Sequence, residues 1–577
     1  MIKRLSKCIR EYKKEAILSP VIVSLEVVMD VVIPFLLAYL IDNGVEKGDI
    51  NYIVKLGAVL VVLALSSLVF GVLAGKLAAK ASAGFARNLR HDMYYNIQNF
   101  SFSNIDKFST SSIITRLTTD VTNVQNAFQM IIRIAVRAPL MLIFSLIASC
   151  LINVKASMAF LVAVPILGVG LFAIIVNAHP IFERVFKTYD KLNNVVQENL
   201  RGIRVVKSYV REEYEKEKFN KVSQSIFEDF SKAEKLLAFN SPLMQFSMYL
   251  VLLLISWISA KLIVTTEMTT GELMSLISYA MQILMNLMML SMIFVMVTIS
   301  RASAERIVEI LDEKSDLTNG KNPKFEIKDG SVSFRNVDFS YTKNKKKPCL
   351  SNINIDIKSG ETIGIIGGTG SGKSSFVQLI PRLYDVTSGH VLVGGTDVKK
   401  YDLDTLRNNV AMVLQKNVLF SGTIKENLRW GNKEATDEEI IHACKLAQAD
   451  EFINDFPDGY DTYIEQGGTN VSGGQKQRLC IARALLKKPK ILILDDSTSA
   501  VDTKTDALIR KAFKEEIPDT TKFIIAQRIA SVQDADKIIV MDEGNIVAFG
   551  THNELLKNEI YLELYNSQTK GGNQDEK

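Results

Sequence analysis

The octet GGTGSGKS, residues 367–374, has residue types and spacing that suit phosphate chemistry. It matches G-x-x-x-x-G-K-[ST] in full, follows the strand-like ETIGII and precedes the helix-like SFVQLIPRLY. In that context the glycines let backbone N–H groups close around phosphate oxygens, Lys373 reaches the β- and γ-phosphates, and Ser374 can hold Mg²⁺. The predicted nucleotide-binding residues are Gly367, Gly368, Thr369, Gly370, Ser371, Gly372, Lys373, Ser374 and Ser375.

A second chemical stretch is ILILDDSTSAVD, residues 491–502, which is typical of a buried strand that ends in two carboxylates. Asp495 is the predicted second residue on the metal side of the site. Asp496 stands where a nucleotide hydrolase would place the base for its attacking water, and Asp is one methylene shorter than Glu. The stretch therefore raises the question of whether this chain hydrolyses its nucleotide or only holds it.

The length and composition of the chain indicate which domains position these groups. Its 577 residues are too many for one core, so several domains are expected. Residues 17 to about 300 contain long apolar runs, whereas residues 325–577 have the pattern of a soluble α/β protein. The net charge of +5 is small and its Lys and Arg excess lies beside the apolar runs, so no nucleic-acid partner is needed. The five scattered cysteines predict reduced thiols and no metal site.

Six apolar segments are long enough to cross a bilayer, which needs roughly 20 residues of helix. They lie near 17–41, 53–75, 132–152, 157–178, 241–264 and 274–298. The long links at 76–131 and 179–240 are rich in Lys and Arg, so the positive-inside rule places them and both termini in the cytoplasm. No cleavable signal peptide is apparent.

The long links have good helix formers, and a helix over 53–100 would be about 70 Å long at 1.5 Å per residue. Such helices either decorate the cytoplasmic side or carry motion from the membrane to a second domain; we favour the second interpretation because a nucleotide-binding domain follows.

Two features of the spans suggest a path for cargo. Glu26 and Asp30 lie four residues apart on one helix face, and carboxylates inside a membrane tend to face a cavity. They could equally form a structural pair bonded to a neighbouring helix. Met281, Met285, Met288 and Met292, with Met296, recur at helical spacing and would suit varied apolar molecules, although ordinary packing or lipid contact gives the same pattern.

The stretch NVSGGQKQRLCIARALL, residues 470–486, stands about twenty residues before the ILILDD strand and resembles the signature of ABC transporter ATPases. With the six spans, the whole chain resembles an ABC exporter half-transporter of the heterodimeric multidrug type. The resemblance implies that Tyr341 stacks on adenine, that Gln415 contacts Mg²⁺ and faces the coupling helices, and that ATP and Mg²⁺ are the ligands. It also implies that Ser499–Asp502 form a loop across a dimer of ATPase domains. The signature residues Val471, Ser472, Gly473, Gly474 and Gln475 would meet the partner's ATP.

Two positions depart from the family. Glu is usual where this chain has Asp496, and His is usual where it has Gln527. A shorter base misplaces its carboxylate, and misplacements near 1 Å can cost about 10²-fold in rate. Gln527 can donate a hydrogen bond but cannot become a cation. We therefore interpret the chain's own pocket as degenerate, binding ATP well and hydrolysing it slowly, with an intact signature that completes the catalytic site of a second, different half-transporter.

The predicted fold is an α-helical membrane domain of six spans with long cytoplasmic extensions, joined to an α/β P-loop NTPase domain of ABC type. The expected boundaries are a transmembrane domain over 1–312, a linker over 313–330, a nucleotide-binding domain over 331–567 and a polar tail over 568–577. The predicted function is ATP-driven export of amphiphilic or drug-like compounds across the plasma membrane, in contact with membrane lipid. A lipid or lipid-linked flippase and a nucleotide-gated, non-transporting regulatory protein remain the alternatives. Six spans exclude a soluble ABC ATPase.

Overall fold

The structure is a computed structural model that describes residues 1–341, 348–497 and 500–571. The chain divides into two compact units: Met1–Gln98 with Ser109–Glu313, and Asn99–Phe108 with Lys314–Lys577. The segment Asn99–Phe108, which the sequence placed in the transmembrane domain, packs with the second unit instead. The reason is local bonding within that unit, where Ser101 Oγ donates to Asp316 Oδ1 at 2.6 Å and Tyr384 Oη to Asp106 Oδ2 at 2.7 Å.

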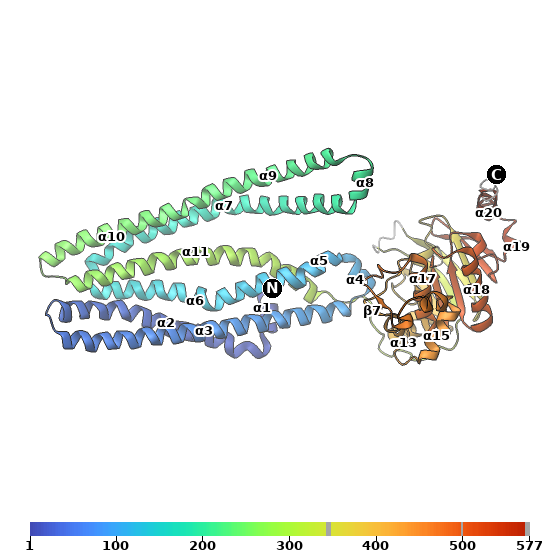
Figure 1. Cartoon of the computed structure of the whole chain (residues 1–577), viewed down its shortest axis with the longest axis horizontal. Helices are drawn as coiled ribbons and strands as arrows, with labels where there is room; N and C mark the ends of the chain where they lie inside the picture. Colours follow the sequence, from blue (N-terminus) through green and yellow to red (C-terminus); the bar gives the residue numbers. More distant parts are fainter. Residues whose placement is uncertain (342–347, 498–499, 572–577) are drawn as a thin grey trace. The chain divides into compact units, whose positions relative to one another are not determined.

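The first unit is built of long helices (Figure 1). Within the described residues, six helical segments are long and apolar enough to cross a membrane, which confirms the six predicted spans. Their main helices are α2 (Lys13–Leu40), α3 (Ile50–Gln98), α6 (Val121–Ile152), α7 (Val154–Arg201), α10 (Asn240–Val264) and α11 (Thr270–Asp312). Small buried residues of α3, among them Ala74, Ala78 and Ala81, let neighbouring helices approach closely.

The long links are helical, as predicted. α3 is one helix of 49 residues, and α7 continues past its apolar part for a total of 48. The short α8 (Ile203–Ser208) connects α7 to α9 (Glu212–Ala238), which runs back alongside α7 (Figure 1). The first link is different at its far end, where α4 (Phe102–Lys107) and α5 (Thr110–Thr115) interrupt the long helices.

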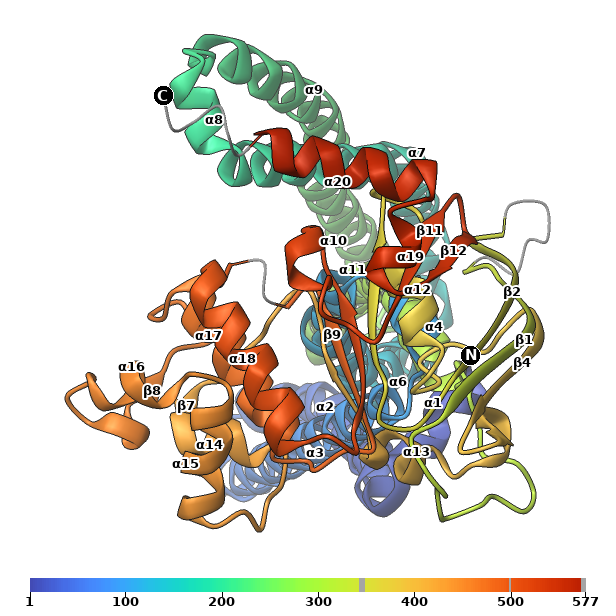
Figure 2. The ribbon, with the colours of Figure 1, turned by 90° about the vertical axis from the view of Figure 1, so that its right-hand side faces the viewer.

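The second unit contains a six-stranded sheet of order β12-β11-β3-β10-β9-β6 and a four-stranded sheet of order β2-β1-β4-β5 (Figure 2). The strands of the larger sheet are β3 (Thr362–Gly367), β6 (Val410–Val413), β9 (Ile491–Asp495), β10 (Thr521–Ile525), β11 (Lys537–Asp542) and β12 (Asn545–Gly550). The smaller sheet consists of β1 (Val332–Phe339), β2 (Leu350–Ile357), β4 (Ser388–Val393) and β5 (Thr396–Asp397).

Five neighbouring strands of the larger sheet, β11, β3, β10, β9 and β6, run parallel. β9 and β10 are buried along their whole length, as a parallel sheet covered on both faces requires. The carboxyl ends of β3, β9, β10 and β6 therefore meet at one edge, and the side chains that follow these strands gather there. This arrangement confirms the predicted α/β fold of the second unit.

The helices that serve this edge are α12 (Lys373–Gln378), α17 (Gly473–Leu485) and α18 (Thr503–Glu516). The last helix of the chain, α20 (Glu559–Gly571), follows the short α19 (His552–Leu555) (Figure 2). Because α20 runs to Gly571, the boundary expected between a domain ending at 567 and a polar tail lies inside this helix.

Candidate functional site

The phosphate loop forms where β3 ends. Gly370 and Gly372 have φ of +84° and +93°, left-handed values that glycine adopts without strain. Gly367 has φ of +150°, and a Cβ built on it would lie 2.1 Å from the carbonyl oxygen of Met541. The loop can therefore take this path only with glycine at position 367. Around Gly368 and Gly370 a Cβ would meet nothing within 4 Å, so the concave side of the loop is open to a ligand.

Lys373, the first residue of α12, reaches back over this loop. Its Nζ donates to the carbonyl oxygens of Gly367 and Gly368 at 2.8 and 2.6 Å. Burial lowers the pKa of Lys373, and the carboxylates of Asp495 and Asp496 act in the opposite direction. The ammonium group is thus poised beside the loop, where a phosphate would offer it the negative charge that its surroundings only partly supply.

The metal-side pair is assembled. Ser374 Oγ donates to Asp495 Oδ1 at 2.9 Å, and Asp495 is 4% exposed at the end of β9. Burial raises the pKa of Asp495, which a divalent cation bound there would reverse. A serine hydroxyl and a carboxylate are oxygen ligands of the kind that Mg²⁺ prefers, so these residues fit the predicted ion. Gln415 lies exposed just beyond β6, which pairs with β9 at this same edge.

The two departures from the family pattern touch each other. Gln527 Nε2 donates to Asp496 Oδ2 at 2.7 Å. Asp496 is 8% exposed and has φ of +49°, a left-handed conformation that Asp tolerates better than most residues. Its carboxylate therefore already has a donor in Gln527, an amide that remains neutral at every pH. The sequence placed both residues in one pocket but gave no sign of this hydrogen bond.

The predicted base-stacking residue lies beside α12. Tyr341 is half-exposed, and its hydroxyl is 2.9 Å from Ser375 Oγ and donates to Gln378 Oε1 at 3.2 Å. Its ring packs edge-on against Tyr384 at 5.0 Å between centroids. Tyr384, which the sequence reading missed, also bonds Asp106 of α4.

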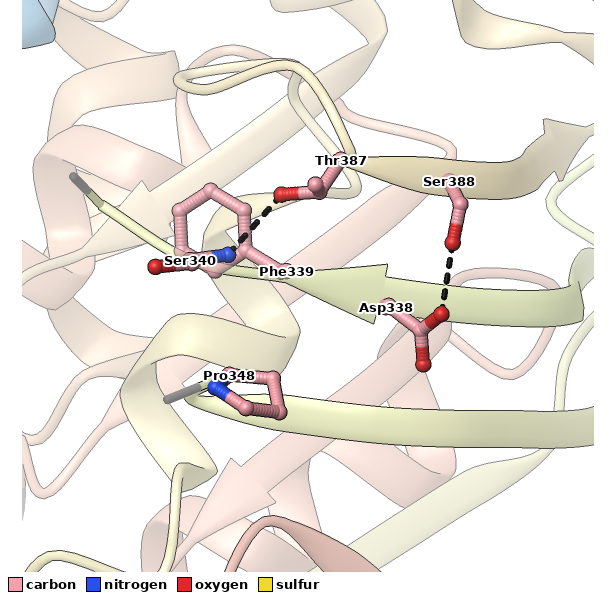
Figure 3. A pocket seen from close by; sticks show the side chains of 6 residues that line it. All are labelled: Asp338, Phe339, Ser340, Pro348, Thr387 and Ser388. Atoms are coloured by element: carbon pink, nitrogen blue, oxygen red, sulfur yellow. Dashed lines mark hydrogen bonds between the residues drawn. The ribbon is translucent and has the colours of Figure 1, made fainter. Parts of the chain in front are cut away.

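The end of β1, just before Tyr341, lines a small cavity of about 190 Å³ (Figure 3). Ser340 N donates to Thr387 Oγ1 at 3.0 Å, and Ser388 Oγ donates to Asp338 Oδ2 at 2.6 Å. Phe339 lines the cavity and contacts the Tyr341 ring. These contacts hold the strand that presents Tyr341; the cavity itself does not include the phosphate loop.

The signature residues occupy the start of α17. Ser472 is its N-cap: Ser472 Oγ accepts from Gln475 N at 3.3 Å, and Gln475 Oε1 accepts from Ser472 N at 2.9 Å. Gly473 and Gly474 follow, and a Cβ on Gly474 would lie 2.9 Å from the Ala500 carbonyl oxygen. Among the described residues, no hydrogen bond joins Val471–Gln475 to this chain's own phosphate loop. Ser472 is exposed at the first turn of α17.

The loop before α18 packs on the signature helix, where Ala500 N donates to Gln477 Oε1 at 3.1 Å. Asp502 is the N-cap of α18 and accepts from Thr505 N at 2.9 Å, which lowers the pKa of Asp502. Ser499 lies outside the described residues. Asp502 therefore has a structural duty in addition to its predicted place in a dimer loop.

In the first unit, the two carboxylates proposed for cargo are paired. Arg137 of α6 donates to Glu26 Oε1 at 2.6 Å and to Asp30 Oδ2 at 2.7 Å, and Ser67 Oγ donates to Asp30 Oδ1 at 2.6 Å. Glu26 is 5% exposed. This is the bonding to a neighbouring helix that the sequence left open as the alternative to a cargo role. Met281, Met285, Met288 and Met292 are all exposed on α11 in the single chain.

Known proteins resemble both units. Residues 17–288 match the family profile described as ABC transporter transmembrane region, and residues 350–499 match the one described as ABC transporter. The ABC transporter ATP-binding protein YfiB of Bacillus subtilis is 37% identical over 564 residues, or 97% of either chain. The chain belongs to the ABC transporter family.

Two further likenesses refine this placement of the transporter. The putative multidrug export ATP-binding/permease protein YgaD of Bacillus subtilis is 31% identical, over 98% of this chain and 99% of its own. A solved bacterial Atm1-family ABC exporter with ATP bound superposes with a TM-score of 0.81 over 97% of this chain and 98% of its own, at 23% identity. That structure shows the fold, an exporter-type arrangement of six spans and one ATPase unit in a multi-pass membrane protein.

Proposed function

We propose that this ABC transporter is one subunit of a heterodimeric, ATP-driven exporter in the plasma membrane, with both termini in the cytoplasm. Its own pocket retains ATP, and its signature completes the hydrolytic site of a second, different half-transporter. The observation that carries this proposal is the Gln527–Asp496 hydrogen bond of 2.7 Å. This hydrogen bond engages the carboxylate that stands at the position of the general base. Its donor, Gln527, stands where the family has a histidine, and a glutamine amide cannot carry positive charge.

The residues divide the work as follows. The phosphate-loop N–H groups, Lys373 and Ser374 would bind the phosphates and Mg²⁺ with Asp495 and Gln415, and Tyr341 would stack on the base. Mg²⁺ supplies charge neutralisation of the phosphates when it is bound. Asp496 would lie short of the attacking water, and a general base must come within hydrogen-bond reach of the proton that it takes. The bound nucleotide would therefore persist in this pocket.

The signature would act on the partner's nucleotide. Ser472 begins α17, so its hydroxyl and the first N–H groups of that helix would face the γ-phosphate across a head-to-tail dimer. Removing one donor that stabilises developing charge typically costs about 10²–10³ in rate. Ser472→Ala should therefore slow turnover of the complex by roughly that factor, whereas Asp496→Asn should leave it within about twofold, a change of less than 0.5 kcal/mol.

The cargo we propose is amphiphilic or drug-like. The multidrug export name of YgaD and the exposed methionine face of α11 support this class.

The test is affinity purification of the chain from native membrane, followed by parallel trapping and photocrosslinking with photoreactive ATP labelled at the γ- or the α-phosphate. The γ label on a subunit reports intact ATP, and the α label reports ATP or ADP. A different half-transporter should copurify, and the label on this chain should remain ATP through many turnovers. Rapid conversion to ADP on this chain, or a complex that contains this chain alone and turns over normally, would refute the proposal.

A further inference from the structure

The last helix of the chain carries a stripe that ends in an amide. Tyr561 is fully buried, and Leu564 and Tyr565 pack against the same core cluster. Gln568 follows seven residues after Tyr561, which is two helical turns and returns to the same face. The apolar stripe thus anchors α20 on the ATPase unit and places Gln568 on the face of α20 that packs against this unit.

Gln568 contacts the loop that carries Gln527. Gln568 Nε2 donates to the carbonyl oxygen of Gln527 at 2.9 Å, and Gln568 Oε1 accepts from Ile529 N at 2.8 Å. One side-chain amide therefore holds the backbone on both sides of Arg528, across 41 and 39 residues of sequence. A donor and an acceptor used together fix both the position and the orientation of this loop.

The fixed loop reaches directly into the pocket. Gln527 itself donates to Asp496 Oδ2 at 2.7 Å, and Asp496 is 8% exposed beside Asp495. β10, which leads into the loop, pairs with both β3 and β9, so the other end of the loop is held by the sheet. From outside the sheet, Gln568 bonds the loop backbone on both sides of Arg528, and Asp506 of α18 accepts from Ser531 Oγ at 3.0 Å farther along the chain.

We propose that Gln568 is a positioning residue for the nucleotide pocket: by clamping the backbone at Gln527 and Ile529, α20 sets how long this chain keeps its nucleotide. The inference rests on the proposed function, because it takes Gln527 as a residue that faces the γ-phosphate. Gln568, the first residue of the expected polar tail, would then control residence time at the holding site. Anything that lifts α20 would hasten nucleotide release.

The experiment uses the full chain with the partner that copurifies. The complex is loaded with 8-azido-ATP labelled at the α-phosphate and chased with excess ATP. It is then photolysed at intervals, so that the label in this chain's band reports release, whether or not the nucleotide has been hydrolysed. We expect Gln568→Ala to release label about fivefold to tenfold faster than wild type. Gln568→Glu keeps the acceptor for Ile529 N but loses the donor to Gln527, so its rate should fall between the two.

Two controls separate positioning from general stability. Ser567→Ala changes the neighbouring residue of α20 and should release label within twofold of wild type. Within the part of the chain that the structure describes, the Ser567 hydroxyl bonds its own helix at the Leu564 carbonyl. In a Gln527→Ala background, Gln568→Ala should add less than twofold, because the side chain that it positions is gone. A purely structural role would give the same fold-change in both backgrounds.

Release from Gln568→Ala within twofold of wild type, or an equal effect with and without the Gln527 side chain, would overturn the inference. The γ-phosphate label addresses the other question separately. If that label is lost rapidly while the α-phosphate label is still retained in a Gln568-dependent manner, the proposed holding pocket fails and the clamp stands.

Discussion

Replacing Arg137 with methionine should destabilise the membrane unit more than almost any other single change in it. Arg137 is the cation for both Glu26 and Asp30, whose side chains are 7% and 20% exposed, while its own is 32% exposed. Removing one partner of a buried ion cluster strands the opposite charge and costs about 3–5 kcal/mol. Because Arg137 is one third exposed, we expect a loss near the lower end, about 3 kcal/mol.

Removing the cation and both carboxylates together should relieve this loss of stability. The triple variant Arg137→Met, Glu26→Gln and Asp30→Asn removes the cation together with both of its carboxylates and should lie within about 1 kcal/mol of wild type, since neutral replacements of buried ion clusters are often tolerated. Arg133→Met is the matched control. Arg133 is on the same helix one turn earlier. Within the described part of the chain it forms no ion pair and acts on Glu26 only at longer range, so its loss should cost less than about 1 kcal/mol.

The assay can report on this unit alone, because the chain has two tryptophans and only Trp257 is in the membrane unit. In a Trp430→Phe background, Trp257 fluorescence during denaturation with sodium dodecyl sulfate gives the relative stability of each variant. If Arg137→Met unfolds at the same detergent concentration as wild type, or if the triple variant unfolds as early as Arg137→Met, the ion cluster does not stabilise the unit as argued. Export of a cationic and a neutral dye by Glu26→Gln with Asp30→Asn then tests the cargo role: a selective loss of the cation would support it.

Three further outcomes are expected. Gly367→Ala should abolish ATP binding measured by photolabelling, because its Cβ would meet the Met541 carbonyl at 2.1 Å. Gly368→Ala, whose Cβ would meet nothing within 4 Å, should lower ATP affinity by less than about tenfold. An equal loss of affinity in both variants would contradict the steric argument. Tyr384→Phe should leave ATP affinity unchanged but speed amide exchange in residues 101–108 about fivefold, since it removes a hydrogen bond to Asp106 worth roughly 1 kcal/mol; unchanged exchange would refute this. Asp496→Glu with Gln527→His should raise hydrolysis in this chain's pocket by about 10²-fold, measured by the γ-phosphate label, and no gain would mean that other residues block the site.

The phosphate site was predictable because its chemistry is written in contiguous residues. GGTGSGKS and ILILDD each specify a local backbone, and parallel strands bring their carboxyl ends together, so Ser374 and Asp495 had to meet. The six spans were predictable for a similar reason, because length and hydropathy act within each segment. Both are cases in which a local pattern and one general rule of assembly suffice.

Side-chain pairs between distant segments were not predictable in the same way. Arg137 meets Glu26 and Asp30 across more than one hundred residues, and only its presence inside an apolar run hinted that it needed anionic partners. Gln568 was lost in a segment whose composition reads as a polar tail. The spacing from Tyr561 to Gln568 could have revealed that the helix continues, but nothing in it names the loop at Gln527.

The difference between this chain's signature and its own nucleotide pocket gives a reason to expect a partner of different sequence. The signature is complete and well capped at Ser472, so it can serve a working site, whereas the pocket pairs its shortened acid with a neutral amide. Under the proposed function, two copies of this chain would set two intact signatures against two slowly hydrolysing pockets, and neither site would gain the family's Glu. A partner with the family's Glu and His would supply the pocket that this chain's signature completes, and in the proposed complex the Gln568 contact would act at the site that retains its nucleotide.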